Sequence, residues 1–334
     1  MYQLDDKTLK LIAKTCKGKT NIKLTVGYID ADGDQTIKVF DETGEIRQDN
    51  YIYEIGSITK TFTASLMAKQ IYEGRMSPDD SISKYIDGLD SNTYYPTLKR
   101  LVTHTSGYAT HLPLSFRENM ALTFAILSGS KKPGVFPFQL DLDKMKKIIR
   151  ENPLKDKDYK WKYSNFAVSM AGYAVGVASG KGYWDAMNDF ISNELGLENT
   201  YTGTRVDKNL RGFTKKNEDI GNWVWNNDLT APAGDLSSTA EDLLKYARIN
   251  LYEEKPYLAL CHQKHAGARF GIDMGLGWIM LKKDNNVLWH TGGTGAFRTY
   301  LAIDKGKKLA VTVLANYTIN PMTLGDVILE NLQK

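Results

Sequence analysis

Cysteine and long apolar segments are both scarce in this sequence. Two cysteines, Cys16 and Cys261, occur in 334 residues. They are too few for a disulfide framework or a zinc site, although a single bridge between them stays open. No segment is long enough to span a bilayer, and the N-terminus lacks the unbroken apolar core of a signal peptide. We expect a cytoplasmic protein if Met1 is the native start, and a secreted or surface-exposed one if a leader was removed.

An excess of one charge is also missing. Lysine and arginine number 43 against 39 acidic residues, for a net charge of +4, and the two signs are interspersed. This pattern argues against nucleic-acid binding and leaves at most a weak preference for anionic substrates. No phosphate loop, dinucleotide fingerprint or G-x-S-x-G is present, so no cofactor is expected and an α/β-hydrolase is excluded. The expected partner is a small molecule, and the expected state is a monomer.

Strand patterns occur near both ends of the chain, and helical patterns dominate between them. Alternation and turn signals predict strands at residues 21–30, 36–40, 276–281, 287–290, 298–303 and 309–315, with a turn at residues 284–286. Helices are predicted near the N-terminus, at residues 57–73, 166–178 and 322–332, and after a capping box at residues 238–241. We therefore expect an α+β fold in which residues 1–74 and 240–334 build a sheet and residues 75–239 form a mainly helical region.

The helix that begins at Ser57 carries a candidate nucleophile. Ser57 and Lys60 form an S-x-x-K pattern, and residues three apart share one helix face, so the lysine can accept the serine proton. The helix dipole favours an alkoxide at the first turn. The same pattern occurs at Ser81 and Ser128, but in a turn and a loop. Only Ser57 begins a long helix with an apolar stripe, and Gly56 before it leaves room over the hydroxyl.

A second pattern, Tyr163-Ser164-Asn165, directly precedes the predicted helix at residues 166–178. A phenol near a lysine can relay a proton to a leaving group, and the Asn165 amide can bind a lysine and a substrate carbonyl. The structural alternative is a tyrosine packed at a helix start, with Asn165 as the N-cap.

A third pattern, His290-Thr291-Gly292-Gly293, follows a predicted strand. Glycine permits close backbone approach, so an N–H here can form half of an oxyanion hole, with the N–H of Ser57 as the other half. The alternative is a glycine-rich turn between two strands.

Together the three patterns resemble, in order and spacing, those of the serine β-lactamase and penicillin-binding-protein superfamily. The tyrosine in the second pattern is similar to the class C β-lactamase and D-aminopeptidase or esterase branch. Stretches at residues 53–63, 101–107 and 232–239 match that branch too, and the resemblance covers roughly residues 20–330. It implies an antiparallel sheet flanked by helices, a helical region carrying Tyr163, and an active site between the two.

The resemblance also implies acyl transfer without a metal or cofactor. Lys60, with Tyr163, deprotonates Ser57, and the N–H groups of Ser57 and Gly293 hold the oxyanion. Tyr163 then protonates the leaving group. The substrate-binding residues implied in addition to Gly293 are Asn165, His290, Thr291 and Gly292. The implied substrates are small esters or cell-wall-derived D-amino-acid compounds.

His290 departs from the Lys-Thr-Gly form that is usual in the superfamily's efficient β-lactamases. Lysine is a permanent positive charge beside a substrate carboxylate, whereas histidine is only partly charged near neutral pH. We therefore expect weak or absent β-lactam turnover and measurable hydrolysis of small activated esters. The rival interpretation is a penicillin-binding or cell-wall-binding protein that acylates with little turnover. Its hallmark would be loss of Lys60, of Tyr163 or of the glycines of the third pattern, and all are present.

Other groups are weaker candidates. The run from Cys261 to His265 offers metal-ligating side chains, but no further ligand is evident, and a solvated surface segment is expected. No metal site is predicted, and His104 is expected to support a loop rather than act as a base. Five loop aromatics are candidates for the wall of the cleft: Tyr94, Tyr95, Tyr108, Trp223 and Trp225.

Overall fold

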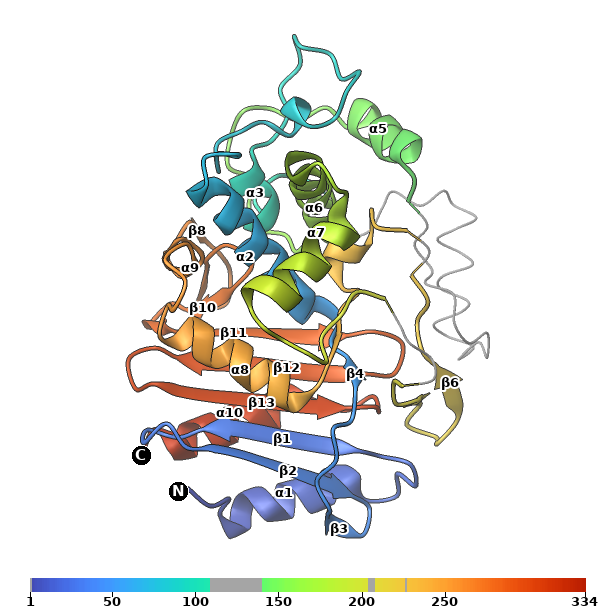
Figure 1. The fold of residues 1–334 in the computed structure, drawn as a ribbon, viewed down its shortest axis with the longest axis vertical. Coiled ribbons are helices and arrows are strands. Elements are labelled where there is room, and N and C mark those ends of the chain that lie inside the picture. The colour runs from blue at the N-terminus through green and yellow to red at the C-terminus, as the bar shows by residue number, and fades with distance from the viewer. Residues whose placement is uncertain (1, 109–139, 204–207, 226) are drawn as a thin grey trace.

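Both ends of the chain contribute strands to one large sheet (Figure 1). The computed structural model describes residues 2–108, 140–203, 208–225 and 227–334. The strands of the sheet are β1 (Leu24–Ile29), β2 (Gln35–Asp41), β3 (Gly44–Ile46), β8 (Ala266–Gly267), β9 (Ile272–Met274), β10 (Ile279–Leu281), β11 (Asp284–Gly293), β12 (Arg298–Asp304) and β13 (Leu309–Ala315). Their order is β3-β2-β1-β13-β12-β11-β10-β9-β8, and all neighbours are antiparallel. The predicted α+β fold is confirmed.

Helices cover both faces of this sheet and gather above it as drawn in Figure 1. The helices are α1 (Asp6–Cys16), α2 (Thr59–Tyr72), α3 (Leu98–Val102), α5 (Leu142–Glu151), α6 (Asn165–Ser179), α7 (Tyr183–Asp189), α8 (Ala240–Leu251), α9 (Leu258–Cys261) and α10 (Pro321–Leu332). None of those in the described part of the chain combines the length and apolar character needed to cross a membrane. The division of the chain at residues 74 and 240 into two domains stays a prediction.

Side chains along the central strands point alternately into two apolar cores, one on each face of the sheet. In β1, Leu24, Val26 and Tyr28 pack with α1 and α10 on one face of the sheet. In β13, Ala310 and Leu314 point to the other face, where α8 and α2 lie. Successive side chains of a strand point to opposite faces, so a central strand covered on both sides must be apolar at nearly every position.

The two cysteines belong to different cores. Cys16 is buried with α1 and α10, and Cys261 is buried on the opposite face. Both are free thiols. The sheet separates them, so the bridge that the sequence left open does not form.

Helix α2 is enclosed on nearly all sides, because every residue from Thr59 to Ala68 is buried. Ser57 precedes it in a 3-10 turn, η1 (Gly56–Ile58). The predicted end of the helix before Gly74 is confirmed, since the helix stops at Tyr72 and Gly74 adopts a φ of +74°. A helix covered on more than one face was expected from its apolar positions, and this is observed.

Two local predictions are wrong by one or two residues. The predicted turn at residues 284–286 lies instead at residues 282–283, because Leu281 pairs directly with Asp284. The N-cap of α8 is Thr239, whose Oγ1 accepts the Asp242 N–H at 3.2 Å. Ser238, the predicted cap, is held in a short strand that pairs with Tyr53.

Candidate active site

A cleft of about 530 Å³ opens where the end of β11 meets η1 and the segment before α6. The structure brings the three sequence patterns together there, since Ser57, Tyr163 and all of His290 to Gly293 line it. The other described lining residues are Trp161, Ile279, Trp289, Arg298, Ile319, Asn320, Pro321 and Met322. The last four, residues 319–322 around the start of α10, were not expected from the sequence.

Ser57, which lines this cleft, is in direct contact with Lys60. Lys60 Nζ lies 3.0 Å from Ser57 Oγ and donates to the Ala233 carbonyl oxygen at 2.5 Å. The lysine side chain is buried, whereas Ser57 is partly exposed. Burial lowers the pKa of Lys60 well below its usual range. An uncharged amine beside a hydroxyl is able to take its proton.

Glycines are required here because two backbone segments touch. Gly56 has a φ of +52°, and a Cβ on it would lie 2.5 Å from the Gly293 nitrogen. Gly56 was expected to leave room over the Ser57 hydroxyl. In the structure its missing side chain instead permits a close backbone contact with Gly293. A Cβ on Gly292 would lie 1.9 Å from the Ile55 carbonyl oxygen and 2.1 Å from Thr299 Oγ1. These contacts bring the end of β11 against the turn that holds Ser57.

Tyr163 stands over the lysine. Lys60 Nζ lies 4.9 Å from the centre of the Tyr163 ring. Desolvation raises the pKa of Tyr163, and a hydrogen bond with the Ser57 hydroxyl acts in the opposite direction. The phenol therefore keeps its proton at neutral pH and is suited to donate it.

The backbone around Tyr163 is held by His104. His104 Nδ1 accepts the Ser164 N–H at 3.2 Å, and the His104 carbonyl oxygen accepts the Lys162 N–H at 2.9 Å. The rings of His104 and Tyr163 are 4.5 Å apart. Burial lowers the pKa of His104 well below its usual range, which keeps its imidazole neutral and Nδ1 an acceptor. His104 was predicted to support a loop. In the structure it supports the segment that carries Tyr163, the candidate catalytic tyrosine.

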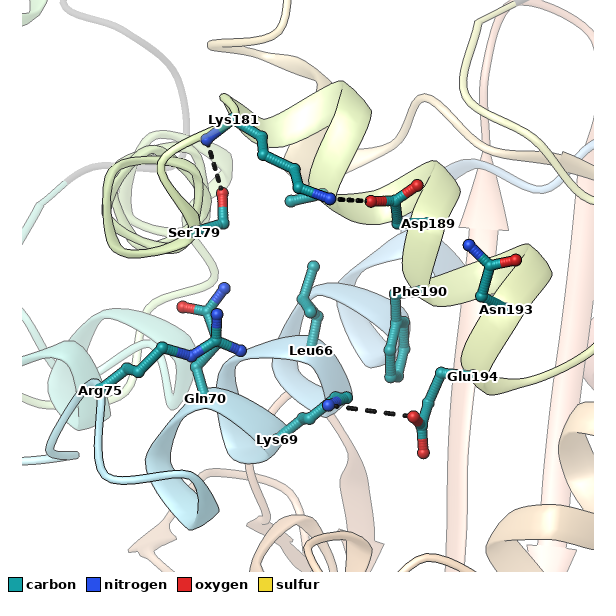
Figure 2. A pocket seen from close by; sticks show the side chains of 11 residues that line it. Leu66, Lys69, Gln70, Arg75, Ser179, Lys181, Asp189, Phe190, Asn193 and Glu194 are labelled. Carbon is teal, nitrogen blue, oxygen red and sulfur yellow. Dashed lines mark hydrogen bonds and ion pairs between the residues drawn. The ribbon is translucent and has the colours of Figure 1, made fainter.

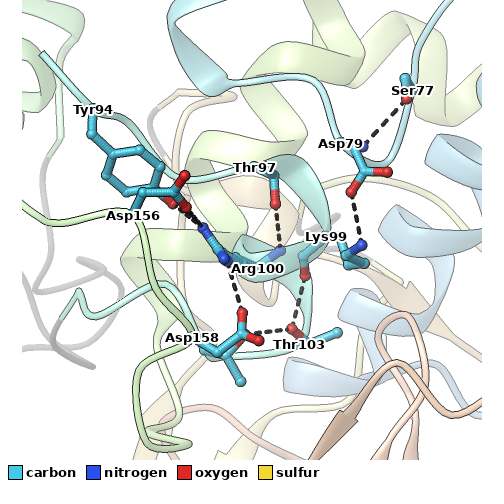
Figure 3. A network of polar contacts seen from close by, with 10 residues as sticks. Ser77, Asp79, Tyr94, Thr97, Lys99, Arg100, Thr103, Asp156 and Asp158 are labelled. Carbon is cyan, nitrogen blue, oxygen red and sulfur yellow. Dashed lines mark hydrogen bonds and ion pairs between the residues drawn. The ribbon is translucent and has the colours of Figure 1, made fainter.

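A network of ion pairs holds the segment before Tyr163 against α3 (Figure 3). Arg100 on α3 donates to Asp156 at 2.6 Å, to Asp158 at 2.8 Å and to the Tyr94 hydroxyl at 2.5 Å. Tyr94 therefore serves this network and is not among the described residues that line the cleft.

Replacing His104 by alanine is expected to lower kcat about tenfold or more, with a smaller change in KM. The variant leaves the buried Ser164 N–H without an acceptor, which costs roughly 1–3 kcal/mol, and removes the ring beside Tyr163. Asparagine tolerates the positive φ of 62° at this position and carries an acceptor oxygen. His104→Asn should therefore recover much of the lost kcat in steady-state ester hydrolysis. Equal losses in both variants would contradict the positioning role.

His290 is a neutral acceptor in this structure. Its Nδ1–H donates to the Thr291 carbonyl oxygen at 2.6 Å, so Nε2 carries the lone pair. This Nε2 is buried and has no hydrogen-bond partner in the described residues. Burial and the proximity of Lys60 lower the pKa of His290 to about 3. The expectation of a partly charged histidine near neutral pH is therefore wrong.

The role of Asn165 in substrate binding stays a prediction. Asn165 is the first residue of α6 and is not among the described residues lining the cleft. It is not the N-cap either, because Ser164 Oγ accepts the Ala167 N–H at 3.0 Å. The serine side chain is one atom shorter and is already oriented by the contact of its own N–H with His104.

The aromatic wall of the cleft differs from the one expected. Trp161 and Trp289 line it, whereas the five predicted loop aromatics are absent from its described lining. Tyr95, Tyr108 and Trp225 are buried. Their positions in the sequence could have indicated these two tryptophans, because each stands within two residues of Tyr163 or His290.

The other described residues that the sequence offered as a nucleophile or as metal ligands have structural roles. Ser81 caps a short helical turn by accepting the Ser83 N–H at 3.3 Å, and Ser128 lies outside the described residues. The solvated segment expected at Cys261 and His262 is wrong, since both are buried. His262 contacts Glu253 and Asn250, each at 3.0 Å. Among the described residues no group of side chains is arranged for a metal ion.

A second hollow, of about 310 Å³, lies between α2 and residues 179–194 (Figure 2). Four of its charged groups pair with one another: Lys181 contacts Asp189, and Lys69 Nζ lies 3.8 Å from a Glu194 oxygen. None of the predicted site residues lines it. It is therefore not a candidate for the chemistry.

The family model described as Beta-lactamase matches residues 17–328. A β-lactamase of Pseudomonas fluorescens is 26% identical over 311 residues, which are 80% of each chain. The D-alanyl-D-alanine-carboxypeptidase/endopeptidase AmpH of Escherichia coli (strain K12) is 26% identical over 337 residues, covering 92% of this chain and 81% of the relative. A solved β-lactamase/D-alanine carboxypeptidase from Pseudomonas syringae superposes with a TM-score of 0.76 at 20% identity, covering 98% of this chain and 97% of the other.

Proposed function

Because the chain belongs to the Beta-lactamase family of serine hydrolases, we propose that it cleaves ester or amide bonds through an acyl-enzyme formed on Ser57. The observation that carries the proposal is the 3.0 Å contact between Ser57 Oγ and the buried amine of Lys60. A serine hydroxyl needs a neighbouring base, and this is the base that the cleft offers it.

In the first step Lys60 is the base. The Ser57 Oγ proton moves to Lys60 Nζ as Oγ forms a bond with the substrate carbonyl carbon. The resulting ammonium is stabilised by the Ala233 carbonyl oxygen, which already accepts from Lys60 at 2.5 Å. The N–H groups of Ser57 and Gly293 bind the oxyanion, an assignment supported by the contact between η1 and the end of β11.

Tyr163 is the acid. Its raised pKa keeps the phenol protonated, so it can donate to the leaving alcohol or amine as the tetrahedral intermediate collapses. The proton gained by Lys60 then restores the phenol. In deacylation a water molecule attacks the acyl carbonyl, its proton passes to the same pair, and Ser57 leaves as the alcohol.

The substrate class follows from the neutral His290. Since the third pattern supplies no permanent positive charge, we propose small esters and D-amino-acid esters or amides as substrates, with little β-lactam turnover. The name of the Escherichia coli relative, a D-alanyl-D-alanine carboxypeptidase, supports the D-amino-acid part. Localisation and a monomeric state stay predictions.

Intact-mass analysis during hydrolysis of p-nitrophenyl esters tests this function. The parent should show a transient mass increase equal to the acyl group together with continued release of p-nitrophenol. Ser57→Ala should show neither, whereas Ser81→Ala, the matched serine of the second S-x-x-K pattern, should behave as the parent does. Acylation of Ser57→Ala would sink the assignment. A lasting adduct without turnover would favour the slow-acylating binding protein, and rapid nitrocefin hydrolysis would overturn the proposed substrate class.

A further inference from the structure

Glu54 carries a buried carboxyl that the proposed mechanism does not use. It lies three residues before Ser57 on the short strand β4 (Tyr53–Glu54), and the residue is only 2% exposed. Strand β4 pairs with β7 (Ser237–Ser238). The backbone therefore fixes the place of this carboxyl relative to the candidate nucleophile.

The carboxyl of Glu54 reaches two further segments. Its Oε1 accepts the Trp223 N–H at 2.8 Å, and the Thr294 hydroxyl lies near enough to favour its charged form. Thr294 directly follows Gly293, whose N–H is proposed to bind the oxyanion. The Trp223 side chain packs on the same turn, since a Cβ on Gly295 would lie 2.9 Å from Trp223 Nε1. One side chain thus joins the segment of the nucleophile to the turn after the third pattern.

Three buried polar atoms around this carboxyl have no hydrogen-bond partner in the described part of the chain: Glu54 Oε2, Thr294 Oγ1 and Asn222 Oδ1. An ionised carboxylate can accept the Thr294 O–H at Oε2. A neutral carboxyl carries a proton there that Asn222 Oδ1 can accept, and its other hydrogen bonds lose the added strength of a charged acceptor. The charged form therefore holds Thr294 more firmly than the neutral form does.

The charge of this carboxyl changes in the neutral range. Burial raises the pKa of Glu54 to about 7, and the Asp235 carboxyl adds to the rise. The charged or titratable groups on its own and the neighbouring segments are Tyr53, Lys60, Asp219, Asp235, His290 and Arg298. Asp219 is paired with Arg211 and ionises well below neutral pH. Tyr53 stays protonated, His290 stays neutral and Arg298 stays charged. Lys60 and Asp235, whose pKa is also raised to about 7, are the groups that a test must separate from Glu54.

We propose that Glu54 is a positioning residue for acyl transfer, and that its ionised carboxylate holds Thr294, and with it the Gly293 N–H, in the arrangement that binds the oxyanion. Protonation of Glu54 loosens Thr294 and slows the reaction. This inference rests on the proposed function, because it concerns the same oxyanion site.

The dependence of kcat on pH in p-nitrophenyl ester hydrolysis tests the inference. In the parent, kcat should rise about tenfold between about pH 6 and pH 8, the effect of roughly one hydrogen bond to a charged group, with little change in KM. Glu54→Gln mimics the neutral carboxyl, so it should lose this rise and keep the low-pH kcat throughout. Thr294→Val removes the hydroxyl and should lose the rise as well, and it serves if the glutamine variant does not fold.

Two matched variants separate Glu54 from other carboxyls. Asp235→Asn keeps an acceptor for the Trp184 indole N–H, which Asp235 accepts at 2.6 Å, and removes the negative charge that acts on Glu54. The rise should persist in this variant and move to lower pH, because ionisation of Glu54 is no longer opposed. Asp242→Asn replaces a buried carboxyl in the first turn of α8 and should leave the rise at its parental pH.

Three outcomes would overturn the inference, and they differ from failure of the proposed function. They are a parent without the rise, a Glu54→Gln variant that keeps it, as titration of Lys60 alone would give, and a Glu54→Gln variant fixed at the parental high-pH kcat. Ser57 would still acylate in each case. Absence of any Ser57-dependent hydrolysis would instead refute the proposed function and this inference with it.

Discussion

Replacement of Lys60 by methionine is expected to abolish most of the activity and to make the protein more stable. Loss of a general base typically lowers the rate by about 10²–10⁴-fold. At the same time the variant removes a buried amine that has no carboxylate partner in the described residues, and methionine fills a similar apolar space. We expect the melting temperature to rise by more than about 2 °C, the shift that about 1 kcal/mol produces in a large domain.

The dependence on pH identifies the cause of this gain. The pKa of Lys60 is lowered in the folded state, so the unfolded chain binds a proton that the folded chain does not. Parental stability therefore rises as the pH approaches the unfolded value of about 10.4. The difference in melting temperature between Lys60→Met and the parent should shrink between about pH 7 and pH 9.5.

Lys69→Met on the same helix is the matched control. Lys69 contacts Glu73 and lies near Glu194, and its side chain is 23% exposed, so its charge is solvated and paired. This variant should keep its activity and gain no stability. If Lys60→Met retained more than about a tenth of the parental kcat/KM in ester hydrolysis, Lys60 would not be the base.

Replacement of Gly292 by alanine is the second change with a large expected effect. The new Cβ would overlap the Ile55 carbonyl oxygen and Thr299 Oγ1, at 1.9 and 2.1 Å, so β11 must move away from η1. Overpacking of this kind costs roughly 1–3 kcal/mol. Displacement of the Gly293 N–H from the oxyanion should lower kcat by about 10²–10³-fold, as loss of one donor does.

Gly293→Ala tests whether the loss of stability depends on which of the two neighbouring glycines is replaced. A Cβ there meets nothing closer than 3.6 Å and the N–H is retained, so thermal unfolding should show little loss of stability. Gly267→Ala, in β8 of the same sheet, has its nearest contact at 3.9 Å and should match the parent in both activity and melting temperature. A Gly292→Ala variant as stable and active as Gly267→Ala would refute the backbone contact.

Much of the site was predictable because its chemistry is local in sequence. The contact of Ser57 with Lys60 needs only a spacing of three residues on a helical turn. The strand at residues 309–315 was predicted with its observed bounds, since a run of seven apolar or small residues fits a strand covered on both faces. The N-caps of two helices lie one residue from the predicted positions. Before α8 the Ser238 hydroxyl contacts Thr200, and before α6 the Ser164 N–H is held by His104, so contacts far away in sequence orient both segments.

The electrostatic environment of the site was decided by the tertiary structure alone. The sequence determined which three patterns exist, in what order, and that a serine with a nearby lysine leads them. Only folding buries Lys60 and His290 and so lowers the pKa of both, since desolvation depends on what surrounds a group rather than on its neighbours in the chain. Folding also sets Arg298 beside Gly293 through the register of β11 and β12. The candidate nucleophile could therefore be identified from the sequence, whereas the electrostatic surroundings of the site could not.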